Sequence, residues 1–229
     1  MDASRRIEGM LTLINSISAA SFEARELVVP VSGGSDSALN FWLCCQAFAR
    51  RVGGGKVVGV HAGTNLRARN WFELVGPIQY VATPGEYAER EEMRWARFLS
   101  MSLERHAWLV GSRNRTEDML GTYSLASRVA TYLPLVNVWK TEVMDLCRFV
   151  GVPAEVLASS FRADPDCGRP PELAEISMGK IELFLQHTIG ETTEEVLADL
   201  LSPEEIGYLE NLLKRNLFKK TLPVRGIGF

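Results

Sequence analysis

Short apolar runs alternate with longer amphipathic stretches over the first two thirds of the chain. In the longer stretches, apolar residues recur at the spacing of one helix face. The predicted helices of this part are residues 7–23, 37–51, 86–106 and 140–150. The predicted strands are residues 27–31, 56–61, 78–81 and 107–111, with a further short apolar segment at 133–138. Because strands and helices alternate, we expect an α/β fold in which helices cover both faces of a parallel sheet.

The last third of the chain shows helical spacing only. The predicted helices there are residues 173–187 and 193–215. Within the second of them, Ser202 and Pro203 have the serine cap and the first-position proline that begin a helix. We therefore expect one domain over the whole chain, with an α/β core at 24–155 and a C-terminal helical part at 156–229.

A polar, glycine-rich turn joins the first predicted strand to the helix that follows it. The turn reads Ser32-Gly33-Gly34-Ser35-Asp36-Ser37. Glycines let the backbone approach a phosphate, free N–H groups at a helix N-terminus point at it, and the serine hydroxyls add donors. Neither the G-x-x-x-x-G-K-[ST] motif nor the G-x-G-x-x-G motif is present. The turn is a predicted phosphate-binding loop, and the alternative is an ordinary serine-glycine turn capped by Asp36.

Two carboxylates are expected at the same edge of the sheet. Asp36 would repel a bound phosphate unless a divalent cation lay between them, which indicates Mg²⁺. Glu117 follows the strand at 107–111, and the carboxyl ends of parallel strands face one crevice. Glu117 could therefore complete a Mg²⁺ site with Asp36. The alternative is a solvated acid in the first turn of a helix.

Composition narrows the class of protein. The chain has 229 residues, 46% of them hydrophobic and 23% charged, and its net charge is −3. No bulk field would draw it to nucleic acid or anionic lipid, and no apolar run approaches the roughly 20 residues of a membrane span. Its four cysteines form no C-x-x-C motif and no zinc spacing. We expect a cytoplasmic protein with reduced cysteines and with neither nucleic-acid nor membrane partners.

Several motifs carry a resemblance to known enzymes. The turn at 32–37 resembles the S-G-G-x-D-S pyrophosphate loop of N-type ATP pyrophosphatases, which cleave ATP between the α and β phosphates. Four motifs similar to those of ammonia-dependent NAD synthetases follow in order: A-R-x-R-M at 89–93, G-T-x-N-x-[ST]-E at 111–117, P-L-x-x-L-x-K-x-x-V at 134–143 and H-K-R-x-x-P at 218–223. The chain thus resembles a divergent, shortened member of that family over residues 25–223.

The resemblance implies an adenine nucleotide alpha hydrolase-like fold and a ligase reaction. ATP would adenylate a carboxylate with release of pyrophosphate, and ammonia would then displace AMP, as in the conversion of deamido-NAD to NAD. The ammonia would be free or come from a separate donor protein. The family also pairs as homodimers, and the apolar bulk of the helix at 86–106 favours one here. The residues that supply this bulk are Met93, Trp95, Phe98, Leu99 and Met101.

The resemblance also implies roles for individual residues. Asp36 and Glu117 would hold Mg²⁺, and Lys140 would neutralise charge on the departing pyrophosphate. The residues that would bind ATP are Ser32, Gly33, Gly34, Ser35, Asp36, Ser37, Val60, His61, Arg90, Ser112, Thr116, Lys140 and Arg162. The alternative for Lys140 is a solvated lysine, although a lysine at a helix start opposes the helix dipole.

A charged loop near residue 164 offers the candidate base. Ammonia must be neutral to attack, and Asp164 is the candidate by its place in the loop. The loop is either a lid over the adenylate or a solvated segment.

The positions at which this sequence differs from the family's motifs are mostly those that would bind the acid substrate. Only 15 residues, 63–77, separate the second and third strands, where the family has a longer helical insertion. Glu92 stands where the family has an arginine, Met178 where an aromatic residue is usual, and an aspartate near residue 127 is missing. The acid is therefore predicted to differ from deamido-NAD or to be smaller. A related adenylating ligase, a sulfur-transfer enzyme and a non-catalytic ATP-binding regulator remain alternatives.

Overall fold

Four parallel strands form one sheet, in the order β3-β2-β1-β4. The computed structural model describes residues 2–20, 26–50, 55–63, 65–81, 90–160 and 171–221. The strands are β1 (Glu26–Pro30), β2 (Lys56–Ala62), β3 (Ile78–Val81) and β4 (Trp108–Leu109). In the register, Val28 of β1 is paired with Val58 of β2 and with Leu109 of β4. The predicted parallel sheet is confirmed, although the strand expected at 107–111 is shorter and continues as a single bridge from Val110 to Tyr132.

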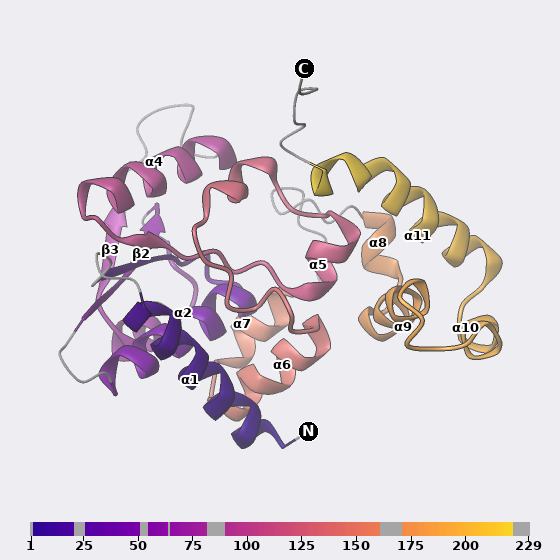
Figure 1. Cartoon of the computed structure of the whole chain (residues 1–229), viewed down its shortest axis with the longest axis horizontal. Coiled ribbons are helices and arrows are strands. Elements are labelled where there is room, and N and C mark those ends of the chain that lie inside the picture. Colours follow the sequence, from indigo (N-terminus) through magenta and orange to yellow (C-terminus); the bar gives the residue numbers. More distant parts are fainter. Residues whose placement is uncertain are drawn as a thin grey trace.

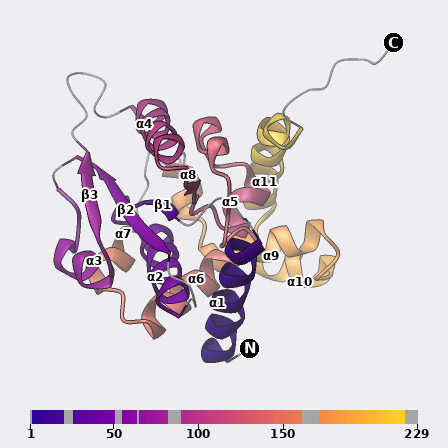
Figure 2. The same cartoon turned by 60° about the vertical axis from the view of Figure 1, so that its left-hand side comes forward.

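Helices lie on both faces of the sheet, as Figures 1 and 2 show. One face is covered by α1 (Ala3–Ala20), α2 (Ser35–Ala49) and α6 (Lys140–Phe149), and the other by α4 (Glu91–Glu104). Side chains of a strand alternate between faces. Accordingly, Leu27 and Val29 pack on the first face, and Val28 packs on the second with Phe98 and Met101. Both faces are buried, which explains the unbroken apolar runs of the strands.

The remaining helices around the strand ends are short. They are α3 (Arg69–Val75), α5 (Arg115–Leu120), the 3₁₀ helix η2 (Leu125–Val129) and α7 (Ala154–Ser159). The sequence pattern did not predict α3, which occupies the short segment between β2 and β3. The segment at 133–138 forms turns rather than a regular element.

The C-terminal helices form a second core beside α5 (Figure 1). They are α8 (Pro171–Glu175), α9 (Met178–Thr188), α10 (Glu194–Leu200), α11 (Pro203–Asn216) and the 3₁₀ helix η3 (Leu217–Lys220). Leu120 of α5 packs among Ile181, Leu185 and Leu209, so this core adjoins the segment that follows β4. No helix in the described ranges combines the length and hydropathy needed to cross a membrane.

Two predicted C-terminal helices are each divided in two, and a serine begins the second half in both cases. Ser177 accepts a hydrogen bond from the Lys180 N–H and begins α9. Ser202 and Glu205 form a reciprocal capping box at the start of α11, with Pro203 in its first turn. The predicted helix start at Ser202 is confirmed, and the continuous helix at 193–215 is wrong because the cap interrupts it.

Candidate active site

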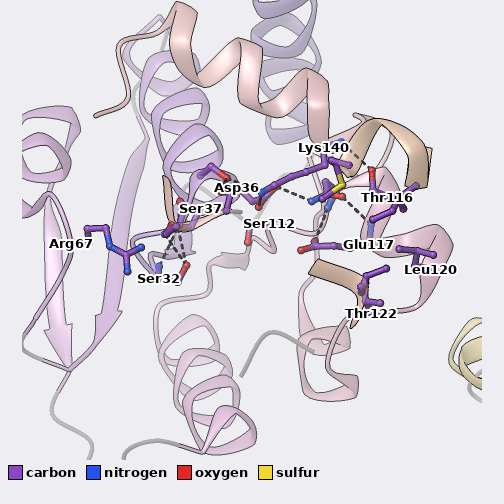
Figure 3. A pocket seen from close by; sticks show the side chains of 18 residues that line it. Ser32, Asp36, Ser37, Arg67, Ser112, Thr116, Glu117, Leu120, Thr122 and Lys140 are labelled. Atoms are coloured by element: carbon purple, nitrogen blue, oxygen red, sulfur yellow. Dashed lines mark hydrogen bonds and ion pairs between the residues drawn. The ribbon is translucent and has the colours of Figure 1, made fainter. Parts of the chain in front are cut away.

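The predicted phosphate loop connects the end of β1 to the start of α2. Its backbone needs glycine at position 33, where φ is +83° and a Cβ would lie 3.2 Å from the Cβ of Arg67. The hydroxyls of Ser32 and Ser37 lie 3.1 Å apart, and Ser37 also donates to the Gly34 carbonyl at 2.9 Å. These bonds fix the loop beside the N-terminus of α2 (Figure 3).

Asp36 does not cap α2, so the interpretation of the loop as an ordinary capped turn is wrong. Gly34 occupies the cap position, and no side-chain hydrogen bond caps the helix there. The Asp36 carboxylate instead accepts a hydrogen bond of 2.8 Å from the Asn114 amide and forms an ion pair with Lys140. The helix N-terminus therefore keeps N–H groups for an anion.

Lys140 is buried at the first position of α6, with its ammonium directed at the phosphate loop (Figure 3). Its side chain is 10% exposed, and its Nζ donates to the Ser35 hydroxyl at 2.7 Å as well as to Asp36. Burial alone would lower the pKa of Lys140, but the charges of Asp36 and Glu117 outweigh it and hold the pKa above its usual value. Lys140 is thus a fixed cation of the site and not a solvated lysine.

Glu117 is the second carboxylate of the site. It is partly exposed through the cavity, yet burial by surrounding protein and the charge of Asp36 raise its pKa to about 7. Lys140 and the Asn114 N–H, which donates to Glu117 at 3.2 Å, act in the opposite direction. Two neighbouring carboxylates are suited to share a divalent cation, since the cation would offset the repulsion between them.

The fit to Mg²⁺ follows from these donors. No cluster of three acidic, histidine or cysteine side chains with ligand geometry occurs among the described residues. Mg²⁺ usually binds one or two carboxylates and completes its shell with substrate phosphates and water. Asp36 and Glu117 fit that pattern, since they lie beside the phosphate loop.

The cavity has two lobes, and residues of the phosphate loop line both. One lobe, of about 370 Å³, is lined by Ser35, Asp36, Glu117 and Lys140 and has an apolar wall. That wall consists of Leu120, Leu173, Met178 and Ile181. The other lobe, of about 360 Å³, extends toward α4. Its lining includes His61, Arg94, Trp95, Arg113 and Tyr123. Both lobes share Ser32, Ser37, Ser112, Glu117 and Thr122.

Most of the predicted ATP-binding residues meet at this cavity. The predicted residues that line it are Ser32, Gly34, Ser35, Asp36, Ser37, His61, Ser112, Thr116, Glu117 and Lys140. Gly33 shapes the loop without lining either lobe, and its carbonyl accepts a hydrogen bond of 3.4 Å from Arg67. The buried Nδ1 of His61 lies 2.7 Å from the Val31 carbonyl, so the imidazole is held against the strand that leads into the loop.

Two other predicted residues, Val60 and Arg90, do not line the cavity. Val60 is fully buried in the core under α4, because it points to that face of β2. Arg90 lies at the start of α4, outside both lobes, and its guanidinium pairs with Glu92. Glu92 is thus neutralised locally, which weakens the argument that it repels a substrate phosphate. Arg162 and Asp164 lie outside the described residues, so their roles stay predictions.

Sequence reasoning missed three residues of the site. Asn114 is fully buried and joins both carboxylates, and its place in the motif at 111–117 was the available signal. The guanidinium of Arg113 stacks 3.4 Å above the centre of the Tyr123 ring, across the turn that follows α5. Glu182 of α9 contacts the segment around Thr116 and Thr141. No local pattern marks Arg113 or Glu182, because their partners lie on other elements.

The sequence is similar to those of known enzymes over most of its length. A family model described as NAD synthase matches residues 85–223. The NH(3)-dependent NAD(+) synthetase of Methanocaldococcus jannaschii is 26% identical over 94% of this chain and 96% of its own length. That of Pyrococcus furiosus is also 26% identical, over 86% of each chain.

Solved structures show the same fold. An NH3-dependent NAD synthetase from Campylobacter jejuni superposes with a TM-score of 0.74 at 19% identity, covering 99% of this chain and 100% of the other. An NMN synthetase from Francisella tularensis superposes with a TM-score of 0.76 at 15% identity, over the full length of both chains.

Proposed function

The chain belongs to the NAD synthase family, and we propose that it is an ATP-dependent, AMP-forming ligase that uses ammonia to convert a nicotinate-containing acid to its amide. Membership confirms the resemblance inferred from the ordered motifs. The sulfur-transfer and regulatory alternatives are not favoured, because curated relatives matching most of the chain are named NH(3)-dependent NAD(+) synthetases.

The observation that carries the proposal is the buried Lys140 ammonium beside the phosphate loop. Asp36 and Ser35 hold it within reach of the anion cradle formed by the loop and the N-terminus of α2. When the acid carboxylate attacks the α-phosphate of ATP, negative charge grows on the departing pyrophosphate. A fixed cation stabilises that charge mainly in the transition state.

The proposed metal and substrates fit the same cavity. Asp36 and Glu117 would hold Mg²⁺, which would offset the negative charge of the ATP phosphates at the two carboxylates. The two lobes share Ser32 and Ser37 of the loop, so two substrates could occupy one lobe each and meet beside it. Asn114 keeps both carboxylates in place through its amide and its N–H.

The acid is proposed to be smaller than a dinucleotide. The segment from β2 to β3 contains only the seven-residue helix α3. The fold also matches an NMN synthetase, and NMN is a mononucleotide. We therefore propose nicotinate mononucleotide as the preferred acid, with deamido-NAD as the second candidate.

A panel of acids tests this function directly. AMP and pyrophosphate release would be measured with ATP, Mg²⁺, ammonium and each acid in turn, with ammonium omitted as the control for amide formation. We expect release with the mononucleotide acid, and an efficiency below roughly 10⁴ M⁻¹s⁻¹ with deamido-NAD. Higher efficiency with deamido-NAD would refute the smaller acid, and no release with either acid would refute the ligase.

The assembly and location are also proposed. We propose a cytoplasmic homodimer that pairs through α4 and η2, which pack together. The apolar pattern of the sequence places Phe98 and Met101 among the side chains available for a dimer interface. Both are instead buried in the core of this chain, beneath α4. The exposed apolar side chains on these two elements are Met93, Leu103, Leu125 and Val129.

A further inference from the structure

Two charged residues are, taken whole, buried more deeply than any others in the described part of the chain. They are Lys140 and Glu182, which are 8% and 4% exposed. Glu182 lies on α9, in the C-terminal helical core, and no ion pair to it occurs among the described residues. Burying a carboxylate costs folding free energy unless hydrogen bonds satisfy its oxygens. The groups that donate to Glu182 therefore indicate its structural role.

Among the described residues, all the donors to Glu182 belong to the two segments that carry Lys140 and Thr116. The Thr116 hydroxyl donates to its Oε1 at 2.8 Å, and the Thr141 N–H donates to the same oxygen at 3.0 Å. The Thr141 hydroxyl donates to its Oε2. Glu182 therefore joins α9 to the starts of α5 and α6 at one point.

These contacts supply the N-terminal cap that α6 lacks. Trp139 occupies the cap position and provides no side-chain hydrogen bond. The Lys140 N–H donates instead to the Thr116 hydroxyl at 3.1 Å, and that hydroxyl is oriented by donating its own proton to Glu182. The first two N–H groups of α6 are thus satisfied from other elements. The carboxylate also offsets the unfavourable placement of a lysine at a helix N-terminus.

We propose that Glu182 is a positioning residue that fixes the first turn of α6 and so aims the Lys140 ammonium at the phosphate loop. This inference rests on the proposed role of Lys140 in adenylation. A displacement of about 1 Å in a reacting constellation can cost on the order of 10²-fold in rate. Loss of Glu182 should therefore slow adenylation through Lys140, without a large change in ATP affinity.

A double-mutant cycle tests the proposal, with single-turnover AMP formation as the readout. Glu182→Ala should lower the rate on the order of 10²-fold while the KM for ATP stays within about threefold. In a Lys140→Ala background, the same substitution should cause little further loss, because its effect acts through Lys140. Glu182→Gln should retain most of the rate, since the amide oxygen can accept from the Thr116 hydroxyl and the Thr141 N–H while the amide NH2 donates to the Thr141 hydroxyl.

Glu205→Ala is the matched control. Glu205 joins α9 to α11 through Lys180, at 2.8 Å, and caps α11, and no hydrogen bond or ion pair connects it to α6 among the described residues. It should lower the melting temperature without changing the rate of adenylation. If Glu182→Ala fails to fold, Thr141→Val removes one donor to Glu182 and should slow the rate several-fold, again only when Lys140 is present.

The outcomes separate this inference from the proposed function. An unchanged rate in Lys140→Ala alone would overturn the role of Lys140 in the reaction. A large effect of Lys140→Ala, with an equal loss from Glu182→Ala in both backgrounds, would overturn only the positioning role. A fall in rate for Glu205→Ala as large as that for Glu182→Ala would likewise reduce Glu182 to general stability.

Discussion

Three charged residues, Lys140, Asp36 and Glu117, determine which ligands the site can bind. A lysine charge at a helix N-terminus opposes the helix dipole. At Lys140 this charge is stabilised by the ion pair with Asp36 and by the nearby charge of Glu117. Asn114 then holds the two carboxylates, although like charges repel one another. The site thus holds one ammonium and two carboxyl groups in fixed positions. Such a set of groups suits a phosphate-containing substrate that binds together with a divalent cation.

Asp36→Asn should weaken the binding of Mg·ATP by roughly tenfold or more, about 1.4 kcal/mol. The amide is neutral and a poor ligand for Mg²⁺, so the metal loses one of its two protein carboxylates. Calorimetric titration of ATP with and without Mg²⁺ measures the effect, and the metal-free titration is the control. Equal affinity of both proteins for Mg·ATP would exclude Asp36 as a metal ligand.

Glu117 predicts a pH dependence of the stability of the ligand-free protein. Its pKa of about 7 in the folded protein exceeds the ordinary carboxyl value of 4.5, because burial and Asp36 disfavour its charge. The uncharged form therefore stabilises the fold below about pH 4.5, and this contribution is lost as the pH rises to 7.

Glu117→Gln has no carboxyl group to ionise, so its stability should not fall as the pH rises from 4.5 to 7. The variant should therefore become more stable than the wild type as the pH rises. The gain should be on the order of 1 kcal/mol at pH 8, after allowance for solvent that reaches the carboxyl through the cavity. It should shrink toward pH 5.5. Urea unfolding at the two pH values checks this, and a constant difference between the proteins would contradict the raised pKa.

At the scale of elements, local patterns predicted most of the strands and the phosphate loop. The apolar runs of β1 and β2 are continuous because Val28 and Val29 are buried on opposite faces. The loop follows β1 directly, so its place required no long-range information. Ser202 was predicted as a helix start but not as a break in the helix before it, and the break at Ser177 was not predicted, because a cap is a short polar signal inside a helical period.

Gly33→Ala tests the backbone of the phosphate loop. The positive φ and the 3.2 Å approach to Arg67 should cost on the order of 1–2 kcal/mol and weaken ATP binding. Gly151→Ala is the matched control, since Gly151 has a φ of +78° but no atom within 4 Å of the added Cβ and no role at the site. Thermal unfolding and ATP titration should show loss of stability in both variants and loss of binding only in Gly33→Ala.

At the scale of the whole molecule, the site joins the sheet edge to the C-terminal helices. Sequence reasoning placed Asp36, Glu117 and Lys140 correctly at one cavity, since each follows a strand or begins a helix at the same edge. It could not find Glu182 or the stacking of Arg113 on Tyr123, because those contacts depend on how separate elements pack. It also misplaced Val60, which faces the core rather than the cavity.

The assembly prediction belongs to this scale as well. A homodimer should bury Met93 and Val129, which are 42% and 37% exposed in the single chain. Light scattering at micromolar concentration should give twice the 25.5 kDa mass of one chain, and Met93→Asp should reduce the mass toward that of one chain. A mass of one chain for the unmodified protein would exclude the dimer.

The proposed ligase reaction depends above all on Lys140, which would stabilise the departing pyrophosphate during ATP-dependent adenylation. The most direct measurement compares single-turnover AMP formation with Mg·ATP affinity in Lys140→Ala, using Lys180→Ala as the control for loss of a lysine outside the cavity. We expect Lys140→Ala to slow adenylation on the order of 10²-fold or more while the Kd changes less than about threefold, and Lys180→Ala to change neither. Equal losses of rate and affinity in Lys140→Ala, or an unchanged rate, would contradict the claim.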